Sequence, residues 1–316
     1  MSSTSTVASP RRLFGANPTS RRVLIVAGVV LTLSTTGWRS RAPKTYRDPE
    51  RVFPYQELRV NQGIAVAEGT LQRRKPHVFF DLGETIVNLR DTVGVIASFI
   101  GATYPSIARR APDCAKSWFI GLASSVPRDP TLKFETQYEV GRKVLVRVLR
   151  ENGEAADEAQ AGALLRSAWD NWQAKARLCE GVTKEWLRDI GLLSAGVGAV
   201  TDGDEADVRR LLDKMALSRY FDSVTTSEAV RAYKPNPVVY RAALASLDAV
   251  PQSSLFVSDS VLDLEGAHAV GMTAVWFHHV PPDDATTLPP GTVSVMRPKD
   301  LNRVLAGFAE TGRFGT

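Results

Sequence analysis

The chain has 316 residues, of which 44% are hydrophobic and 23% are charged. This composition is typical of a globular protein and excludes a fibrous or low-complexity chain. The length is sufficient for one large or two ordinary domains. Two cysteines, Cys114 and Cys179, exclude a disulfide framework and a cysteine-based zinc cluster.

The formal net charge of +5 is unevenly distributed along the chain. Residues 1–76 hold 13 Lys/Arg and 4 Asp/Glu, a balance of +9, whereas the remainder holds 26 and 30, a balance of −4. Because the remainder is mildly acidic, it lacks the basic character that nucleic-acid binding requires, and we expect no nucleic-acid partner. The basic charge belongs to the N-terminal segment.

Residues 1–76 are predicted to be a basic leader and linker outside the folded domain, since no acidic residue precedes Asp48. The uncharged run 23–38 is shorter than the ~20 residues that a membrane helix needs. Alternatives for the segment are an export signal, an organelle transit peptide, a membrane anchor or a disordered leader. We therefore expect a cytoplasmic protein, with export, organelle targeting or anchoring as alternatives and with any membrane contact confined to residues 23–38.

From His77 onward the pattern of hydrophobic residues changes. The stretch "HVFFD" (77–81) predicts a short buried strand, and apolar residues at helical spacing follow up to about residue 180. The clearest helical stretches in this region are 92–101, 133–152 and 158–178. We expect Trp169 and Trp172 of the last stretch to belong to a helix core.

After residue 180, predicted helices of about ten residues alternate with short apolar strands. The expected strands are 196–201, 221–226, 253–259, 273–277 and 292–296. Such alternation predicts βαβ units with right-handed crossovers and a parallel sheet that is buried on both faces. The predicted fold is therefore α/β, with a doubly wound parallel-sheet core formed by residues 77–90 and 181–316 and an inserted α-helical cap formed by residues 91–180.

Polar residues follow several predicted strands at the points where the strands end. Because the carboxyl ends of parallel strands meet at one edge of a sheet, these side chains are expected to converge on a ligand site. Each residue alone is more typical of a turn or a helix cap. Their order and spacing together are informative, and the set consists of Asp81, Thr201, Lys234, Asp259 and Asp263.

Four stretches carry a resemblance to a known family. They are "FFDLGETIV" (79–87), "GAVTDGD" (198–204), "YKPNPVVYRAAL" (233–244) and "LFVSDSVLDLEGAHAVGM" (255–272). In this order they resemble the motifs of the haloacid dehalogenase-like hydrolase superfamily, in the branch with a helical cap inserted after the first motif. The resemblance covers residues 77–310.

The resemblance implies a catalytic nucleophile, Asp81, that forms an aspartyl-phosphate. It also implies a Mg²⁺ cofactor bound by Asp81, Asp259 and the backbone carbonyl of Gly83. Asp263 is implied either as a further ligand or as a residue behind the ligands. Mg²⁺ is suited to such oxygen donors.

For the transferring phosphoryl group, the resemblance implies binding by Thr201, Asp202 and Lys234. Thr201 and Lys234 are also implied to be catalytic, because phosphoryl transfer depends mainly on positioning and charge neutralisation. The expected partner is a small-molecule substrate, and the sequence does not predict an oligomeric state.

Gly83 departs from the family pattern, because phosphatases of the family commonly have a second Asp at this position. The metal-binding carbonyl is retained, but the general acid, worth about 10²–10⁴-fold in rate, is missing. A good leaving group, or a proton from Glu84 or a cap residue, would compensate. The alternatives are a dehalogenase or another C–X or C–P hydrolase and a non-catalytic binding protein. Since Asp259 and Asp263 are both present, as in metal-dependent members, we favour a Mg²⁺-dependent phosphatase.

Overall fold

The computed structural model describes residues 75–278 and 286–314. The interpretation of residues 23–38 lies outside the described residues. Within the described ranges, no helix combines the length and apolar character needed to cross a bilayer.

The centre of the molecule is a six-stranded sheet in which every neighbouring pair of strands is parallel. The spatial order of its strands is β5-β4-β1-β6-β7-β8. The strands are short and apolar, and most of their residues are buried, as expected for a sheet covered on both faces. Their bounds are β1 His77–Phe80, β4 Gly196–Thr201, β5 Ser223–Thr226, β6 Ser254–Ser258, β7 Thr273–Phe277 and β8 Val293–Val295.

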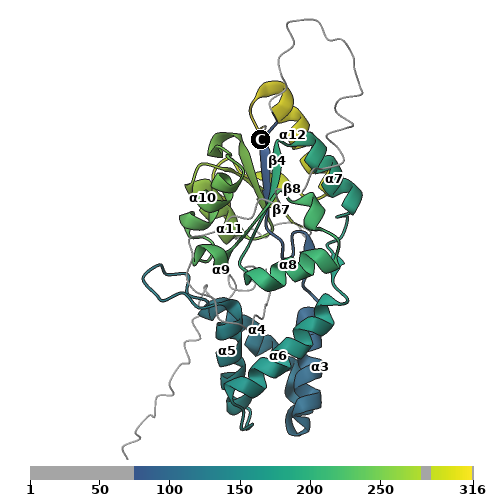
Figure 1. Cartoon of the computed structure of the whole chain (residues 1–316), viewed down its shortest axis with the longest axis vertical. Helices are drawn as coiled ribbons and strands as arrows, with labels where there is room; N and C mark the ends of the chain where they lie inside the picture. The colour runs from purple at the N-terminus through teal and green to yellow at the C-terminus, as the bar shows by residue number, and fades with distance from the viewer. Residues whose placement is uncertain (1–74, 279–285, 315–316) are drawn as a thin grey trace, which may run out of the picture.

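Helices cover both faces of this sheet (Figure 1). Successive side chains of β1 point to opposite faces, so Phe79 packs with helices α10 and α11, whereas Phe80 packs on the side of α7 and α12. On the second side, the rings of Phe80 and Trp186 meet edge to face with centroids 5.6 Å apart. The helix bounds are α7 Lys184–Leu193, α8 Glu205–Lys214, α9 Ser227–Val230, α10 Pro237–Ser246, α11 Val261–Ala269 and α12 Pro298–Thr311.

The cap is a separate group of helices inserted between β1 and β4, below the sheet in Figure 1. Helix α3 packs against α4 and α6, and α5 packs against the same two helices, which closes a four-helix arrangement. Trp169 and Trp172 stack on each other inside it, with ring centroids 4.4 Å apart. The cap elements are α3 Thr92–Thr103, the 3₁₀ turn η1 Pro105–Arg110, α4 Ala111–Ser125, α5 Gln137–Glu151 and α6 Glu158–Gln173.

The cap is joined to the core by two short strands that pair with each other. Strand β2 (Val87–Asn88) enters the cap, β3 (Arg177–Leu178) leaves it, and the two are antiparallel. This architecture confirms the α/β prediction with an inserted helical cap. Helix α4 was not singled out from the sequence, because its small residues and its Gly121 give it a weak amphipathic pattern.

The order of the strands locates a binding crevice. The chain runs outward from β1 through β4 to β5, and then returns to the other side of β1 to build β6, β7 and β8. The direction therefore reverses between β1 and β6, and ligands of open α/β sheets bind at such reversals, beyond the carboxyl ends of the strands. Asp81 directly follows β1 and Asp259 directly follows β6.

Candidate active site

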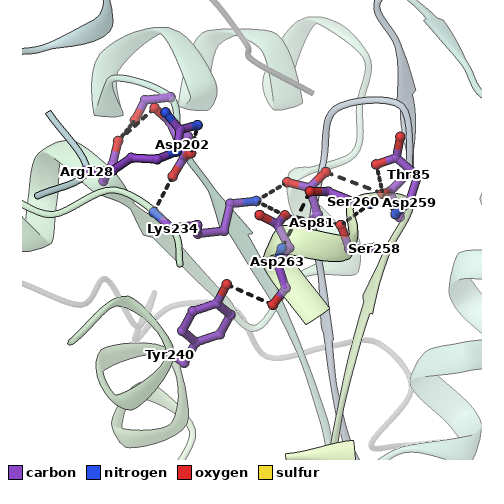
Figure 2. Close-up of polar contacts among 12 residues, drawn as sticks. Asp81, Thr85, Arg128, Asp202, Lys234, Tyr240, Ser258, Asp259, Ser260 and Asp263 are labelled. Carbon is purple, nitrogen blue, oxygen red and sulfur yellow. Dashed lines mark hydrogen bonds and ion pairs between the residues drawn. The ribbon is translucent and has the colours of Figure 1, made fainter. Parts of the chain in front are cut away.

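The centre of the site is a buried ammonium group between two carboxylates (Figure 2). The Nζ of Lys234 lies 2.5 Å from Asp81 Oδ1 and 2.6 Å from Asp263 Oδ2. All three residues are buried. Lys234 comes from the loop before α10, and Asp263 lies in the first turn of α11, so three distant parts of the chain meet at one point.

A second contact joins Asp81 to Asp259. The hydroxyl of Thr85 donates at 3.3 Å to Asp81 Oδ2 or at 3.4 Å to Asp259 Oδ1, and it accepts the backbone N–H of Asp259 at 3.2 Å. The indole N–H of Trp276 donates to the Asp259 carbonyl at 3.0 Å. Thr85 therefore holds the carboxylates that follow β1 and β6 side by side. Thr85 lies within the first motif (79–87), but no pattern in the sequence indicated this bridging role.

Asp263 is fixed by further hydrogen bonds from the core. The hydroxyl of Ser258 donates to Asp263 Oδ2 at 3.1 Å, and the hydroxyl of Tyr240 donates to its backbone carbonyl at 2.9 Å. Since Lys234 contacts the same carboxylate oxygen as Ser258, Asp263 orients the ammonium group toward Asp81. This engagement favours a place for Asp263 behind the metal ligands rather than among them.

Negative charge exceeds positive charge in this cluster. Burial raises the pKa of Asp81 to about 7, against the opposing effect of the Lys234 ammonium, and the Asp263 carboxylate adds to the rise. Burial also raises the pKa of Asp259 well above its usual range, and the Asp81 and Asp263 carboxylates increase the effect. The neighbouring carboxylates raise the pKa of Lys234 although burial lowers it. The single positive charge of Lys234 therefore compensates the negative charge of the three carboxylates only in part.

The donor set fits a hard divalent cation. Asp81 and Asp259 are adjacent through Thr85, and a cation between them would offset the burial that raises the pKa values of both carboxylates. Among residues 75–278 and 286–314, no three His, Cys, Asp or Glu side chains are grouped to hold an ion. Mg²⁺ needs no such cage, because one or two carboxylates with water and substrate oxygens are sufficient. Asp81, Asp259 and the Gly83 carbonyl would be the protein ligands.

The turn after β1 contains Gly83, the residue that departs from the family pattern. Gly83 forms a bridge with Val87, and its backbone is outside the left-handed region, which Glu84 enters instead with φ 54°. The Glu84 carboxylate accepts the N–H of Leu89 at 2.5 Å and contacts Arg90 Nε at 3.4 Å. Glu84 therefore holds the turn, and its carboxylate is directed at the start of the cap rather than at Asp81.

Thr201 is the last residue of β4 and Asp202 follows it, and both are buried. The Thr201 hydroxyl has no hydrogen-bond partner in the described part of the chain. Asp202 Oδ1 accepts the backbone N–H of Lys234 at 2.9 Å, and Oδ2 lies 3.5 Å from Arg128 Nη2. Arg128 comes from the cap, between α4 and α5, and no motif in the sequence pointed to it.

A further cap–core contact lies beside the site. Asp204 is the N-cap residue of α8, yet its carboxylate accepts the first two N–H groups of α5, from Gln137 at 2.9 Å and from Tyr138 at 3.1 Å. The Tyr233 hydroxyl donates to the Glu135 carbonyl at 2.8 Å. A core acid thus satisfies the unpaired amides at the start of a cap helix. The loop that follows Thr201 and the loop that carries Lys234 therefore also hold the cap on the core.

Comparison with known proteins relates the chain to one family and one fold. The profile of the haloacid dehalogenase-like hydrolases matches residues 143–277. An L-2-haloacid dehalogenase from Xanthobacter autotrophicus superimposes with a TM-score of 0.60 at 19% identity, over 74% of this chain and 99% of that one. Over residues 143–277 and in its overall fold, the chain therefore resembles the haloacid dehalogenase-like hydrolases.

Named relatives within the superfamily include two kinds of phosphatase. Phosphoglycolate phosphatase 1 of Pseudomonas aeruginosa is 27% identical over 66% of this chain and 72% of its own length. A glyceraldehyde 3-phosphate phosphatase of Pyrococcus abyssi is 30% identical over 29% of this chain and 38% of its own length. The similarity to these haloacid dehalogenase-like hydrolases is thus partial in length.

Proposed function

We propose that this hydrolase is a Mg²⁺-dependent phosphatase that acts on a small phosphorylated metabolite through an aspartyl-phosphate on Asp81. The observation that carries the proposal is the buried arrangement of Asp81 between Lys234 and the Thr85–Asp259 pair. The phosphatase names of the relatives support the reaction class.

In the first step, an Asp81 carboxylate oxygen attacks phosphorus, the P–O ester bond breaks, and the leaving oxygen keeps the bonding electrons. Water then attacks the phosphorus of the aspartyl-phosphate, which releases phosphate and restores Asp81. Lys234 neutralises charge on Asp81 and on the phosphoryl oxygens. The unpartnered hydroxyl of Thr201 and the backbone N–H of Asp202 bind the phosphoryl oxygens. Bound Mg²⁺ compensates the charge of the carboxylates and of the phosphoryl group.

The leaving oxygen needs a proton when it departs from an alkyl ester. Gly83 has no side chain to supply it, and the Glu84 carboxylate is bound to Leu89 and Arg90. We therefore expect acyl and aryl phosphates, whose leaving groups need no proton, to react faster than alkyl phosphates. The size of this preference measures the cost of the missing general acid.

The test is phosphate release by the full chain from aryl phosphate, acetyl phosphate and a panel of sugar phosphates. We expect release that requires Mg²⁺, stops when EDTA is added and is lost in Asp81→Asn. The matched control is Asp113→Asn, an exposed acid of the cap. Release that persists in Asp81→Asn would contradict the proposal.

A dehalogenase is the second candidate, because Gly83 removes the acid that phosphatases of the family commonly carry. The presence of Asp259 beside Asp81 argues against it, since a metal-free displacement of halide has no use for a second buried carboxylate. Halide release from 2-haloacids that is insensitive to EDTA would establish this alternative. A binding protein without catalysis would turn over neither class, and Asp81→Asn would leave its ligand affinity unchanged.

A further inference from the structure

Arg128 is a cap residue with unused hydrogen-bonding capacity beside the site. Its Nη1 donates to the Ala123 carbonyl at 3.0 Å, and its Nη2 lies 3.5 Å from Asp202 Oδ2. Its Nε–H is buried without a partner in the described residues. The guanidinium group is therefore held in place from two sides with its Nε–H enclosed, while 21% of the side chain remains exposed.

The position of Arg128 relative to the nucleophile follows from Lys234. Asp202 binds the backbone N–H of Lys234, and the Nζ of the same lysine binds Asp81 (Figure 2). Asp202 and its partner Arg128 thus lie about one lysine side chain from Asp81. The hydroxyl of Thr201, next to Asp202, has no partner in the described part of the chain. Two unsatisfied donors, Arg128 Nε and Thr201 Oγ1, accompany the carboxylate of Asp202.

The Arg128–Asp202 contact is long. If Arg128 served only to attach the cap to the core, this contact would hardly explain why its guanidinium group is buried. A charge-assisted pair is shorter, with N–O distances of about 2.7–2.9 Å. An arginine with free donors in a fixed orientation is instead suited to bind a carboxylate through two parallel hydrogen bonds. Asp202 would orient the guanidinium group and keep its remaining donors directed toward the substrate.

We propose that Arg128 is a substrate-binding residue that recognises a carboxylate carried by the phosphate ester. The preferred substrates would then be small phosphorylated carboxylic acids rather than neutral phosphate esters. A carboxylate a few bonds from phosphorus would extend from Asp81 toward Asp202, along the Lys234 side chain that separates the two acids. The inference rests on the proposed phosphatase function. The inference also distinguishes the two substrates that the relatives are named after, because phosphoglycolate carries such a carboxylate and glyceraldehyde 3-phosphate does not.

The test compares phosphoglycolate with 2-hydroxyethyl phosphate, in which a neutral hydroxymethyl group replaces the carboxylate. Both are alkyl esters, so the effect of Gly83 largely cancels in the ratio of their kcat/KM values. We expect Arg128→Gln to lower this ratio about 10- to 100-fold, mainly through the KM of phosphoglycolate. Arg128→Lys should restore part of it, because the charge remains. Arg109→Gln, at an exposed arginine of the cap, is the control and should leave the ratio unchanged.

Asp202→Asn distinguishes recognition from simple fastening of the cap. If the ion pair only fastens the cap, both Arg128→Gln and Asp202→Asn should change the two substrates in proportion and leave the ratio as in the wild type. That result, in variants whose circular dichroism shows folded protein, would overturn the inference and leave the phosphatase proposal intact. A wild-type preference for 2-hydroxyethyl phosphate would also overturn it. Failure of the wild type to release phosphate from any ester would overturn the proposed function and this assignment with it.

Discussion

Buried acids occur in two regions of the core, and they are compensated differently. At the carboxyl end of the sheet, Asp81 and Asp263 share one cation, Lys234, and Asp259 lies next to Asp81 through Thr85. At the junction with the cap, Asp204 accepts two backbone N–H groups of α5, and Asp207 pairs with Arg166 at 3.5 Å and Arg210 at 2.7 Å.

The difference distinguishes acids placed for binding or reaction from acids that hold the structure together. In the first region the protein leaves negative charge uncompensated, which costs stability and is retained where a ligand or a reaction needs it. In the second, each acid meets donors from the cap, and these contacts hold two parts of the chain together, although burial still raises the pKa of Asp204 to about 8 and that of Asp207 to about 7.

Replacing Lys234 with Met removes the cation from the first region. We expect kcat/KM for aryl phosphate to fall about 10²–10³-fold, because the nucleophile and the phosphoryl group lose their neutralising donor. Steady-state phosphate release measures this, and Lys116→Met, at an exposed lysine of α4, is the control. A fall of less than about threefold, outside the range expected for such a donor, would show that Lys234 has no part in the reaction.

Replacing Gly83 with Asp adds a potential proton donor to the same region. The backbone of Gly83 is outside the left-handed region, so an L-residue fits its conformation. We expect alkyl phosphate hydrolysis to rise at least about tenfold relative to aryl phosphate hydrolysis, since only the alkyl leaving group needs a proton. Gly83→Asn is the isosteric control that cannot donate an acidic proton. Equal changes for both esters would argue against a missing general acid.

The two regions also differ in how far the sequence predicted them. Asp81, Asp259 and Lys234 were found from sequence because each stands next to a strand end or in a motif, and strand order alone brings such ends together. Contacts between them, such as the Thr85 bridge, required the structure. The roles of the predicted residues in binding metal and phosphate stay predictions.

The cap junction was not predictable in this way. Arg128 is 74 positions from Asp202, and Gln137 is 67 positions from Asp204. Neither pair has a local pattern that marks it, because their meeting depends on how the cap helices pack on the core. Asp204 even had a plausible local role as the N-cap of α8, and its carboxylate contacts α5 instead.

Replacing Asp204 with Ala tests whether this junction is structural. The N–H groups of Gln137 and Tyr138 lose their acceptor, and we expect the free energy of unfolding to fall by about 1–2 kcal/mol, as for a lost helix cap. Hydrogen exchange at the start of α5 should accelerate, while that of the central strand β1 should change little. Unchanged exchange at α5 would show that the contact does not hold the cap.

The pH dependence of stability tests the same carboxylate through its charge. Burial raises the pKa of Asp204 to about 8, although the N–H groups of Gln137 and Tyr138 oppose this rise. Because the folded pKa lies above the unfolded value of about 3.9, the folded state binds more protons between the two, and the free energy of unfolding falls as the pH rises from about 4 toward 8. Asp204→Asn removes this contribution, so urea unfolding at pH 5 and pH 8 should differ less in the variant than in the wild type. Asp113→Asn, at an exposed acid, is the control and should retain the wild-type difference between pH 5 and pH 8. If Asp204→Asn also retained that difference, the donors from α5 would outweigh the cost of burying the Asp204 carboxylate. The charge of Asp204 would then be fully compensated by its donors. The contrast with the Asp81 region would be larger than the burial of Asp204 alone implies.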